Sequence, residues 1–143
     1  MAESIVVGTD GSDHAERAVE QAIDIAARDG ARLHIVTVYP DPAMFRERIA
    51  SGATSVEINL RGVAENIGSR FTREAEKKGV EVVTDAREGD PADVILDVAK
   101  EVNADLIVVG SRGLSPVRRF LLGSVSAKVT EHARCNVMVV RGD

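Results

Sequence analysis

Short apolar runs alternate with amphipathic segments along the chain. The apolar runs are rich in β-branched residues and predict strands at residues 5–7, 33–39, 106–109 and 137–140. A further strand is predicted to begin with residues 80–83. The segments between them carry apolar residues three and four positions apart, which is the spacing of one helix face. The pattern therefore predicts five strands that alternate with four helices.

Local signals set the boundaries of the predicted helices. The first helix has an apolar face that is followed by Gly30 as a stop, and the face consists of Ala15, Ala18, Val19, Ala22, Ile23 and Ala26. The second has a stripe that ends near Lys77, Lys78 and Gly79, and the stripe consists of Val56, Leu60, Val63, Ile67 and Phe71. Asp90 and Pro91 start the third helix as cap and first-turn residue. Ser124 starts the fourth, and residues 40–54 are predicted to be a loop.

The alternation of strands and helices determines the expected fold class. Right-handed crossovers between successive strands give an open, doubly wound parallel sheet of the Rossmann-like α/β class, with the expected strand order 3-2-1-4-5. Hydrophobic residues make up 44% of the chain and aromatic residues only 3%, so the core is expected to be aliphatic. No linker or low-complexity stretch divides the sequence, and residues 1–143 are expected to form one domain.

Charge and composition narrow the class of partner. A formal net charge of −5 argues against broad nucleic-acid binding, which depends on a basic surface. A small anion remains a suitable ligand, because backbone N–H groups can hold it whatever the net charge. The chain has one cysteine, no apolar stretch of membrane-spanning length and no signal-peptide pattern, so no membrane association and a cytoplasmic location are expected.

Two turns in the sequence resemble each other. Residues 5–11 and residues 107–113 both run from a β-branched strand into a turn that contains two glycines. In doubly wound sheets, ligands bind beyond the carboxyl ends of the strands, where the strand order reverses. If the first and fourth strands are neighbours, these turns face each other across one crevice.

The second of these turns has the spacing of a phosphate-binding loop. Nine residues separate Gly113 from Gly123, and Ser124 then begins a helix whose free N–H groups and dipole favour an anion. The hydroxyl of Ser124 either donates to a phosphate oxygen or caps the helix. Ser111 and Arg112 lie in the same turn, and Arg112 is the best side-chain candidate for a phosphate contact. The alternative is an ordinary loop that contains glycines and an N-cap.

The pattern Gly110-x-x-Gly113, nine residues, Gly123-Ser124 resembles the signature of the ATP-binding branch of the universal stress protein family. The resemblance extends to three further segments and so to nearly the whole chain. Residues 6–12 resemble the family's first strand and acidic turn, Gly89-Asp90-Pro91 its third-strand turn, and residues 121–126 its last turn.

The resemblance implies roles for particular residues. Asp10 contacts the ribose or a divalent metal, Mg²⁺ or Mn²⁺, beside the phosphates. Backbone near Thr9 and Val38 holds the adenine, and Gly89 and Pro91 wall the pocket. The implied phosphate cradle consists of Gly110, Gly113, Gly123 and Ser124, with help from Val125 and Ser126. The resemblance also implies a homodimer through the last strand, Asn136 to Val140, whose edge is otherwise bare.

A structural role for Asp10 stays open, because an aspartate in a turn before a helix often accepts from local N–H groups. Binding is favoured over catalysis. The sequence has no GxxxxGK[ST] motif, no GxGxxG after the first strand and no assembled nucleophile–base set. The histidines are scattered, and Cys135 is expected to be inert.

The expected function is an ATP-binding regulatory module in a stress response, in which nucleotide orders the loop and changes the surface of the dimer. The alternatives are a slow ATP hydrolase in which Asp10 places a metal or water, an AMP or cyclic AMP binding protein, and a dimerisation or chaperone-like scaffold.

Overall fold

The computed structural model describes residues 1–40, 53–111 and 123–141, with the backbone alone for residues 53–59. The elements follow one another in the order predicted from the sequence. They are β1 (Ser4–Thr9), α1 (Asp13–Asp29), β2 (Arg32–Tyr39), α2 (Ala53–Lys77), β3 (Val82–Glu88), α3 (Pro91–Glu101), β4 (Leu106–Gly110), α4 (Ser124–His132) and β5 (Asn136–Val140).

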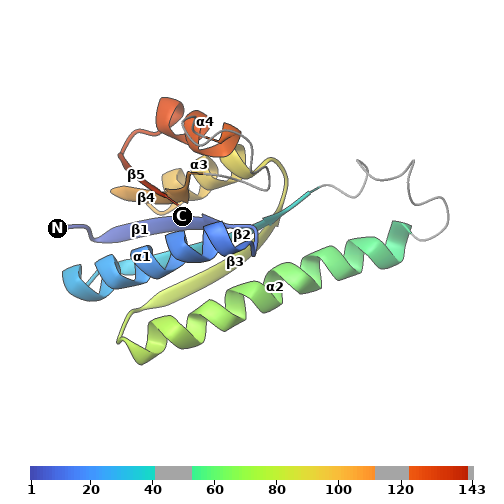
Figure 1. The fold of residues 1–143 in the computed structure, drawn as a ribbon, viewed down its shortest axis with the longest axis horizontal. Helices are drawn as coiled ribbons and strands as arrows, with labels where there is room; N and C mark the ends of the chain where they lie inside the picture. Colours follow the sequence, from blue (N-terminus) through green and yellow to red (C-terminus); the bar gives the residue numbers. More distant parts are fainter. Residues whose placement is uncertain (41–52, 112–122, 142–143) are drawn as a thin grey trace.

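The strands form one parallel sheet in the order β3-β2-β1-β4-β5. Figure 1 shows α1 and α2 on one side of this sheet and α3 and α4 on the other. The prediction of a doubly wound α/β fold with strand order 3-2-1-4-5 is therefore confirmed.

Each face of the sheet has its own aliphatic core. On the α1 and α2 face, Ile5, Val7, Leu33 and Ile35 pack against the helices together with Phe71, and all five are fully buried. On the opposite face, the buried cluster combines strand residues with α3 and α4, and it includes Val6, Val36, Ile95, Ile107 and Val129. Strands with apolar residues on both faces are typical of a parallel sheet covered on both sides.

Two helix boundaries that the sequence predicted are confirmed. Helix α1 ends at Gly30, which has a left-handed conformation and donates its N–H to the carbonyl of Ala26. Asp90 caps α3, because its Oδ2 accepts from the N–H of Asp93 at 3.1 Å, and Pro91 occupies the first helical position. The buried stripe predicted for α1 is also confirmed, since each of its six residues is buried.

Two details of the prediction are wrong. The third strand does not begin at Val80 but runs from Val82 to Glu88, because the N–H of Val80 donates to Ala75 at 3.0 Å and belongs to the end of α2. Val63 of the predicted stripe is 56% exposed, whereas Phe71 of that stripe is buried, because the buried face of α2 passes through Ala64, Phe71 and Ala75. The side chain of Val56 lies outside the described residues, as do residues 41–52 of the predicted loop; α2 already begins at Ala53.

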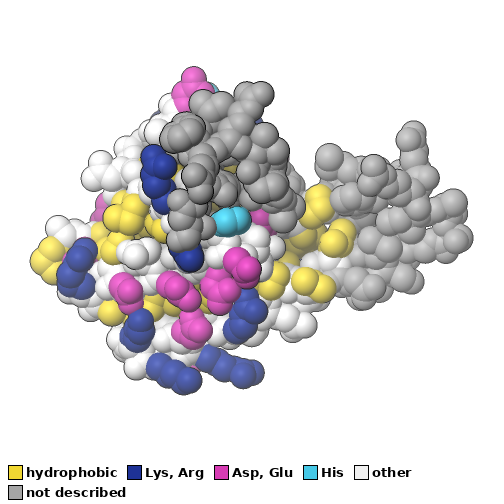
Figure 2. All heavy atoms as spheres, in the orientation of Figure 1, with side chains coloured by type: hydrophobic (Ala, Val, Ile, Leu, Met, Phe, Trp, Pro, Cys, Tyr) yellow, Lys and Arg dark blue, Asp and Glu magenta, His cyan; other side chains and the backbone are white. Residues whose placement is uncertain are grey.

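Charged side chains of both signs intermingle on the molecular face shown in Figure 2, over the region where α1 and α2 lie in Figure 1. Lys78, which directly follows α2, forms a salt bridge with Asp24 of α1, with 2.7 Å between Nζ and Oδ1. Within the residues that are described, no helix is long and apolar enough to span a bilayer.

Candidate functional site

The site is defined by the point at which the strand order reverses. Strand β1 is paired with both β2 and β4, and Val7 of β1 lies opposite Val108 of β4. The chain leaves β1 toward one side of the sheet and leaves β4 toward the other (Figure 1). In doubly wound sheets this is the point where ligands bind, and the neighbouring carboxyl ends of the two strands are called the β1–β4 crevice below. The predicted adjacency of the first and fourth strands is confirmed, and residues 112 and 113 of the second turn lie outside the described residues.

The turn after β1 is held by its own side chains. The N–H of Gly11 donates to Oγ1 of Thr9 at 3.0 Å, and the N–H of Ser12 donates to Oδ1 of Asp10 at 2.9 Å. Gly11 has a φ of 84°, in the left-handed region that favours glycine. Asp10 therefore has the local structural role considered from the sequence. It is also exposed, and a carboxylate that accepts one N–H keeps capacity for further donors or a cation.

Two hydrogen bonds hold the amino end of α4 at the sheet. The N–H of Ser111 donates to the carbonyl of Val140 at 2.8 Å, and the carbonyl of Ser111 accepts from the N–H of Gly123 at 2.7 Å. Because Gly123 immediately precedes α4, these two bonds fix the start of α4 beside the carboxyl end of β4.

The first turn of α4 presents backbone donors. Its first helical bond runs from the N–H of Ala127 to the carbonyl of Gly123, so the N–H groups of Ser124, Val125 and Ser126 precede the helical ladder. None of these three N–H groups has a bond to an acceptor among the described residues. Together with the helix dipole, they form an arrangement that favours an anion.

The two serines of this turn have different surroundings. The cap of α4 is Gly123, and no side chain caps the helix, so the structure does not support the reading of Ser124 as a capping residue. Ser124 is the first helical residue and is exposed. Ser126 is 1% exposed, and its Oγ donates to the carbonyl of Gly123 at 3.0 Å.

The ends of β2 and β3 extend the same edge of the sheet. The N–H of Gly89 donates to the carbonyl of Tyr39 at 3.0 Å, which ties the turn after β3 to the end of β2. Gly89 has a φ of 144°, and a Cβ atom there would lie 3.0 Å from Cγ2 of Val94. A side chain at this position is therefore disfavoured by both backbone conformation and space.

A salt bridge joins the two helices that begin at this edge. Nζ of Lys128 on α4 lies 2.8 Å from Oδ1 of Asp93 and 3.5 Å from Oδ2 of Asp90, both at the start of α3. The pKa of Asp90 is lowered, first by the N–H of Asp93 that donates to its carboxylate and then by the charge of Lys128. The carboxylate is thus stabilised in its charged form.

The predicted site residues fall into two groups along one edge. The neighbouring carboxyl ends of β1 and β4 carry Thr9, Asp10, Gly110 and Ser111, and the amino end of α4, bonded to Ser111, carries Gly123, Ser124, Val125 and Ser126. Val38, Gly89 and Pro91 lie on the β2–β3 side of the same edge. Arg112 and Gly113 lie outside the described residues.

The side-chain donors that are present limit the kind of metal site. Among the residues the structure describes, no three His, Cys, Asp or Glu side chains gather in a way that could hold one. A Mg²⁺ ion, however, commonly uses one or two carboxylates and takes its other ligands from phosphates and water. A single exposed carboxylate at Asp10, beside an anion-favouring helix end, fits that kind of metal.

His34 and Cys135 lie away from this edge. His34 is half-buried in β2, and its pKa is lowered first by burial and then by the charge of Arg32. Burial raises the pKa of the Cys135 thiol, which favours the less reactive protonated form.

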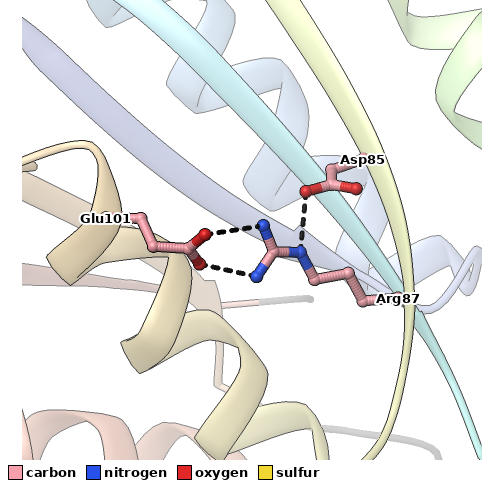
Figure 3. A network of polar contacts seen from close by, with 3 residues as sticks. All are labelled: Asp85, Arg87 and Glu101. Carbon is pink, nitrogen blue, oxygen red and sulfur yellow. Dashed lines mark hydrogen bonds and ion pairs between the residues drawn. The ribbon is translucent and has the colours of Figure 1, made fainter.

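A charged network on β3 was not predicted from the sequence (Figure 3). Nη1 of Arg87 lies 2.6 Å and Nη2 lies 3.1 Å from the two oxygens of Glu101, while Nε lies 2.7 Å from Oδ2 of Asp85. Arg87 raises no local sequence signal, because its partner Glu101 is at the far end of α3. The network fastens α3 to β3, and the contact with Arg87 lowers the pKa of Glu101.

The fold and the site together define a doubly wound α/β protein with a helix amino end at the strand-order reversal. The model of the universal stress protein family matches residues 1–141. The chain therefore belongs to the universal stress protein family.

Individual relatives agree with this family. A universal stress protein of Staphylococcus aureus strain USA300 is 37% identical over 148 aligned residues, which cover 96% of this chain and 83% of the relative. UspA from Lactobacillus plantarum is a similar solved structure, with a TM-score of 0.86, 29% identity and coverage of 97% of each chain. A universal stress protein solved in complex with cAMP has a TM-score of 0.73 and 34% identity, covering 99% of this chain and 98% of that one.

Proposed function

We propose that this protein is an ATP-binding regulatory module of a stress response. The nucleotide binds along the carboxyl edge of the sheet, with its phosphates at the amino end of α4 and its ribose at Asp10. Adenine lies near Thr9 and Val38, against the wall that Gly89 and Pro91 provide.

One observation carries the proposal: the hydrogen bond between the N–H of Gly123 and the carbonyl of Ser111, 2.7 Å long. It holds the amino end of α4 at the β1–β4 crevice, where doubly wound proteins bind their ligands. The N–H groups of Ser124, Val125 and Ser126 then supply the donors for phosphate oxygens, and Gly110 keeps the end of β4 free of a side chain.

A divalent cation, Mg²⁺ or Mn²⁺, is part of the proposal. It would supply positive charge to the phosphates, and the Asp10 carboxylate would hold it. The protein's own contribution is to orient the phosphates through backbone donors, which suits binding more than phosphoryl transfer.

The direct test is mass spectrometry of nucleotides released from the purified protein, followed by calorimetric titration with ATP and Mg²⁺. We expect released adenine nucleotide or saturable binding of ATP at one site per chain. A protein that releases no nucleotide and gives no heat with ATP and Mg²⁺ contradicts the proposal.

Recognition of cyclic AMP or AMP is the second candidate. The observation that favours it is the similar universal stress protein solved with cAMP. A single phosphate needs fewer donors than a triphosphate, and the three N–H groups of the first α4 turn are enough for it. Competition among ATP, AMP and cyclic AMP separates the two candidates, and slow release of phosphate from ATP would add hydrolysis to the first.

We also propose that two copies associate through β5. This strand is the edge of the sheet, and it pairs with β4 on one side only. Its Met138 is 38% exposed, so the edge offers unpaired backbone groups beside an apolar side chain.

A further inference from the structure

Thr37 has a buried hydroxyl that has no hydrogen-bond partner in the described part of the chain. The residue is 2% exposed and lies near the carboxyl end of β2. A buried hydroxyl without a partner costs about 1–3 kcal/mol, so such groups are nearly always satisfied by protein or by ordered water.

The surroundings of Thr37 are polar on one side. In the β1–β2 pair, Thr37 lies opposite Thr9, which is 5% exposed. Both threonines follow residues of the α1 and α2 core by two positions, Val7 in β1 and Ile35 in β2, so both side chains lie on that face of the sheet.

The hydroxyl of Thr9 also has capacity left. Its Oγ1 accepts from the N–H of Gly11, and a hydroxyl has one proton to donate besides its two acceptor positions. Adjacent strands lie about 4.8 Å apart. No direct bond joins the two hydroxyls, since Oγ1 of Thr37 has no partner, and one water with two bonds of about 2.8 Å spans a gap of the order of the strand spacing.

We propose that an ordered water molecule occupies this position and bridges the hydroxyls of Thr9 and Thr37. The water donates a hydrogen bond to Oγ1 of Thr37, which otherwise has no partner, and accepts one from the hydroxyl of Thr9. Thr9 contacts this water through its side chain, whereas its backbone borders the proposed adenine site.

The bridge acts on the turn that carries Asp10. With its proton donated to the water, the Thr9 hydroxyl keeps its lone pairs directed to the N–H of Gly11. Asp10 lies between these two residues, and Ile67 lies against Gly11, where a Cβ atom would come within 2.6 Å of its Cδ1. The water thus stabilises the turn by fixing the Thr9 hydroxyl that accepts from Gly11. Thr37, which holds the water, is therefore a positioning residue for Asp10.

Thr37→Val tests the proposal in the ligand-free protein, so the result does not depend on nucleotide binding. Valine keeps the shape of threonine and removes the hydroxyl. We expect a lower Tm than for the unchanged protein and faster hydrogen exchange at the amides of Gly11 and Ser12. Thr37→Ser, which keeps the hydroxyl, is expected to keep the exchange rates, and Thr84→Val, at an exposed strand position, is the matched control.

A crystal structure that resolves buried waters gives the second readout, with density between Thr9 and Thr37 expected. The proposal is overturned if that position is empty. It is also overturned if Thr37→Val leaves the Tm unchanged or raises it, since removal of an unpaired buried hydroxyl is neutral or stabilising.

Discussion

Single residues decide how the chain turns at the carboxyl edge of the sheet. Asp10 and Asp90 use the same chemistry, since each carboxylate accepts from a backbone N–H two or three residues ahead. The outcomes differ, because Asp90 caps a helix while Asp10 closes a turn that faces the crevice. Substitution of Asp90 is therefore expected to change stability, and substitution of Asp10 is expected to change binding.

Asp90→Ala is expected to lower the free energy of unfolding by about 1 kcal/mol, the typical cost of losing an N-cap carboxylate. Chemical denaturation at neutral pH measures it. Asp97→Ala on the exposed face of the same helix is the control and should change little. Equal losses in the two variants would show that the cap contributes nothing of its own.

The same cap has a defined pH dependence. Because the folded-state pKa of Asp90 is lowered, its contribution is complete above the unfolded-state pKa and is lost as the pH falls through the folded value. Asp90→Asn keeps the cap without the charge, so part of the acid-induced loss of stability should disappear. An unchanged acid transition in Asp90→Asn would contradict this assignment.

Asp10→Ala is expected to weaken binding of ATP in the presence of Mg²⁺ by roughly tenfold or more, as removal of a charged contact worth about 1.5–3 kcal/mol implies. Titration calorimetry measures the change. Asp13→Ala, an exposed acidic residue in the first turn of α1, is the matched control. If both variants bind ATP as the unchanged protein does, Asp10 has only its local role in the turn.

Whole elements bring the proposed site together from distant parts of the sequence. Helix α3 approaches β1 closely because Gly8 has no side chain; a Cβ atom there would overlap Ile95. Lys128 joins α4 to the start of α3, and Arg87 joins β3 to the end of α3. The walls of the crevice are thus fixed by packing and by ion pairs between elements.

Gly123→Val is expected to abolish phosphate binding and leave the fold largely intact. Gly123 has a φ of −62° and a ψ of 159°, an extended conformation that residues other than glycine adopt, so the added side chain crowds the site without straining the backbone. Gly62→Val is the control, because a Cβ atom there meets nothing within 4 Å. Circular dichroism reports the fold, and calorimetry with ATP reports the binding. Full affinity in Gly123→Val would show that the α4 end is not the cradle.

The elements also show what the sequence could and could not predict. The order of the elements could be predicted from the apolar runs and helix stripes, because these signals are local. The similarity of residues 5–11 and 107–113 indicated where the proposed site lies, and this signal is also local. The range of β3 was wrong because its Thr84, Asp85 and Arg87 lack an apolar pattern at an exposed edge. The Arg87–Glu101 pair and the buried hydroxyl of Thr37 depend on three-dimensional contacts that no short pattern encodes.

At the scale of the molecule, the sheet has two unequal edges. Strand β3 at one edge is mostly polar, whereas β5 at the other is the apolar sequence Asn-Val-Met-Val-Val. An apolar edge strand favours pairing with a second copy, and a polar one discourages it. The asymmetry is consistent with the proposed association of two copies through β5 alone.

Met138→Lys is expected to shift the protein from dimer to monomer, because a charge on the β5 edge must lose its hydration when two copies meet. Light scattering after size-exclusion chromatography measures the mass. Val83→Lys, at an exposed apolar position on the opposite edge strand β3, is the matched control and should stay dimeric. A Met138→Lys protein that remains a dimer, or an unchanged protein that is a monomer, would contradict association through β5.

The bond between the carbonyl of Ser111 and the N–H of Gly123 has a consequence for engineering. It joins two residues that are twelve positions apart in the sequence, so the described chain on either side of residues 112–122 meets at one place. Each doubling of a loop costs only about 0.6 kcal/mol of closure entropy. A protein with a peptide or a small reporter domain inserted between Ser111 and Gly123 should therefore still fold. We expect the insertion to change its affinity for nucleotide more than its stability.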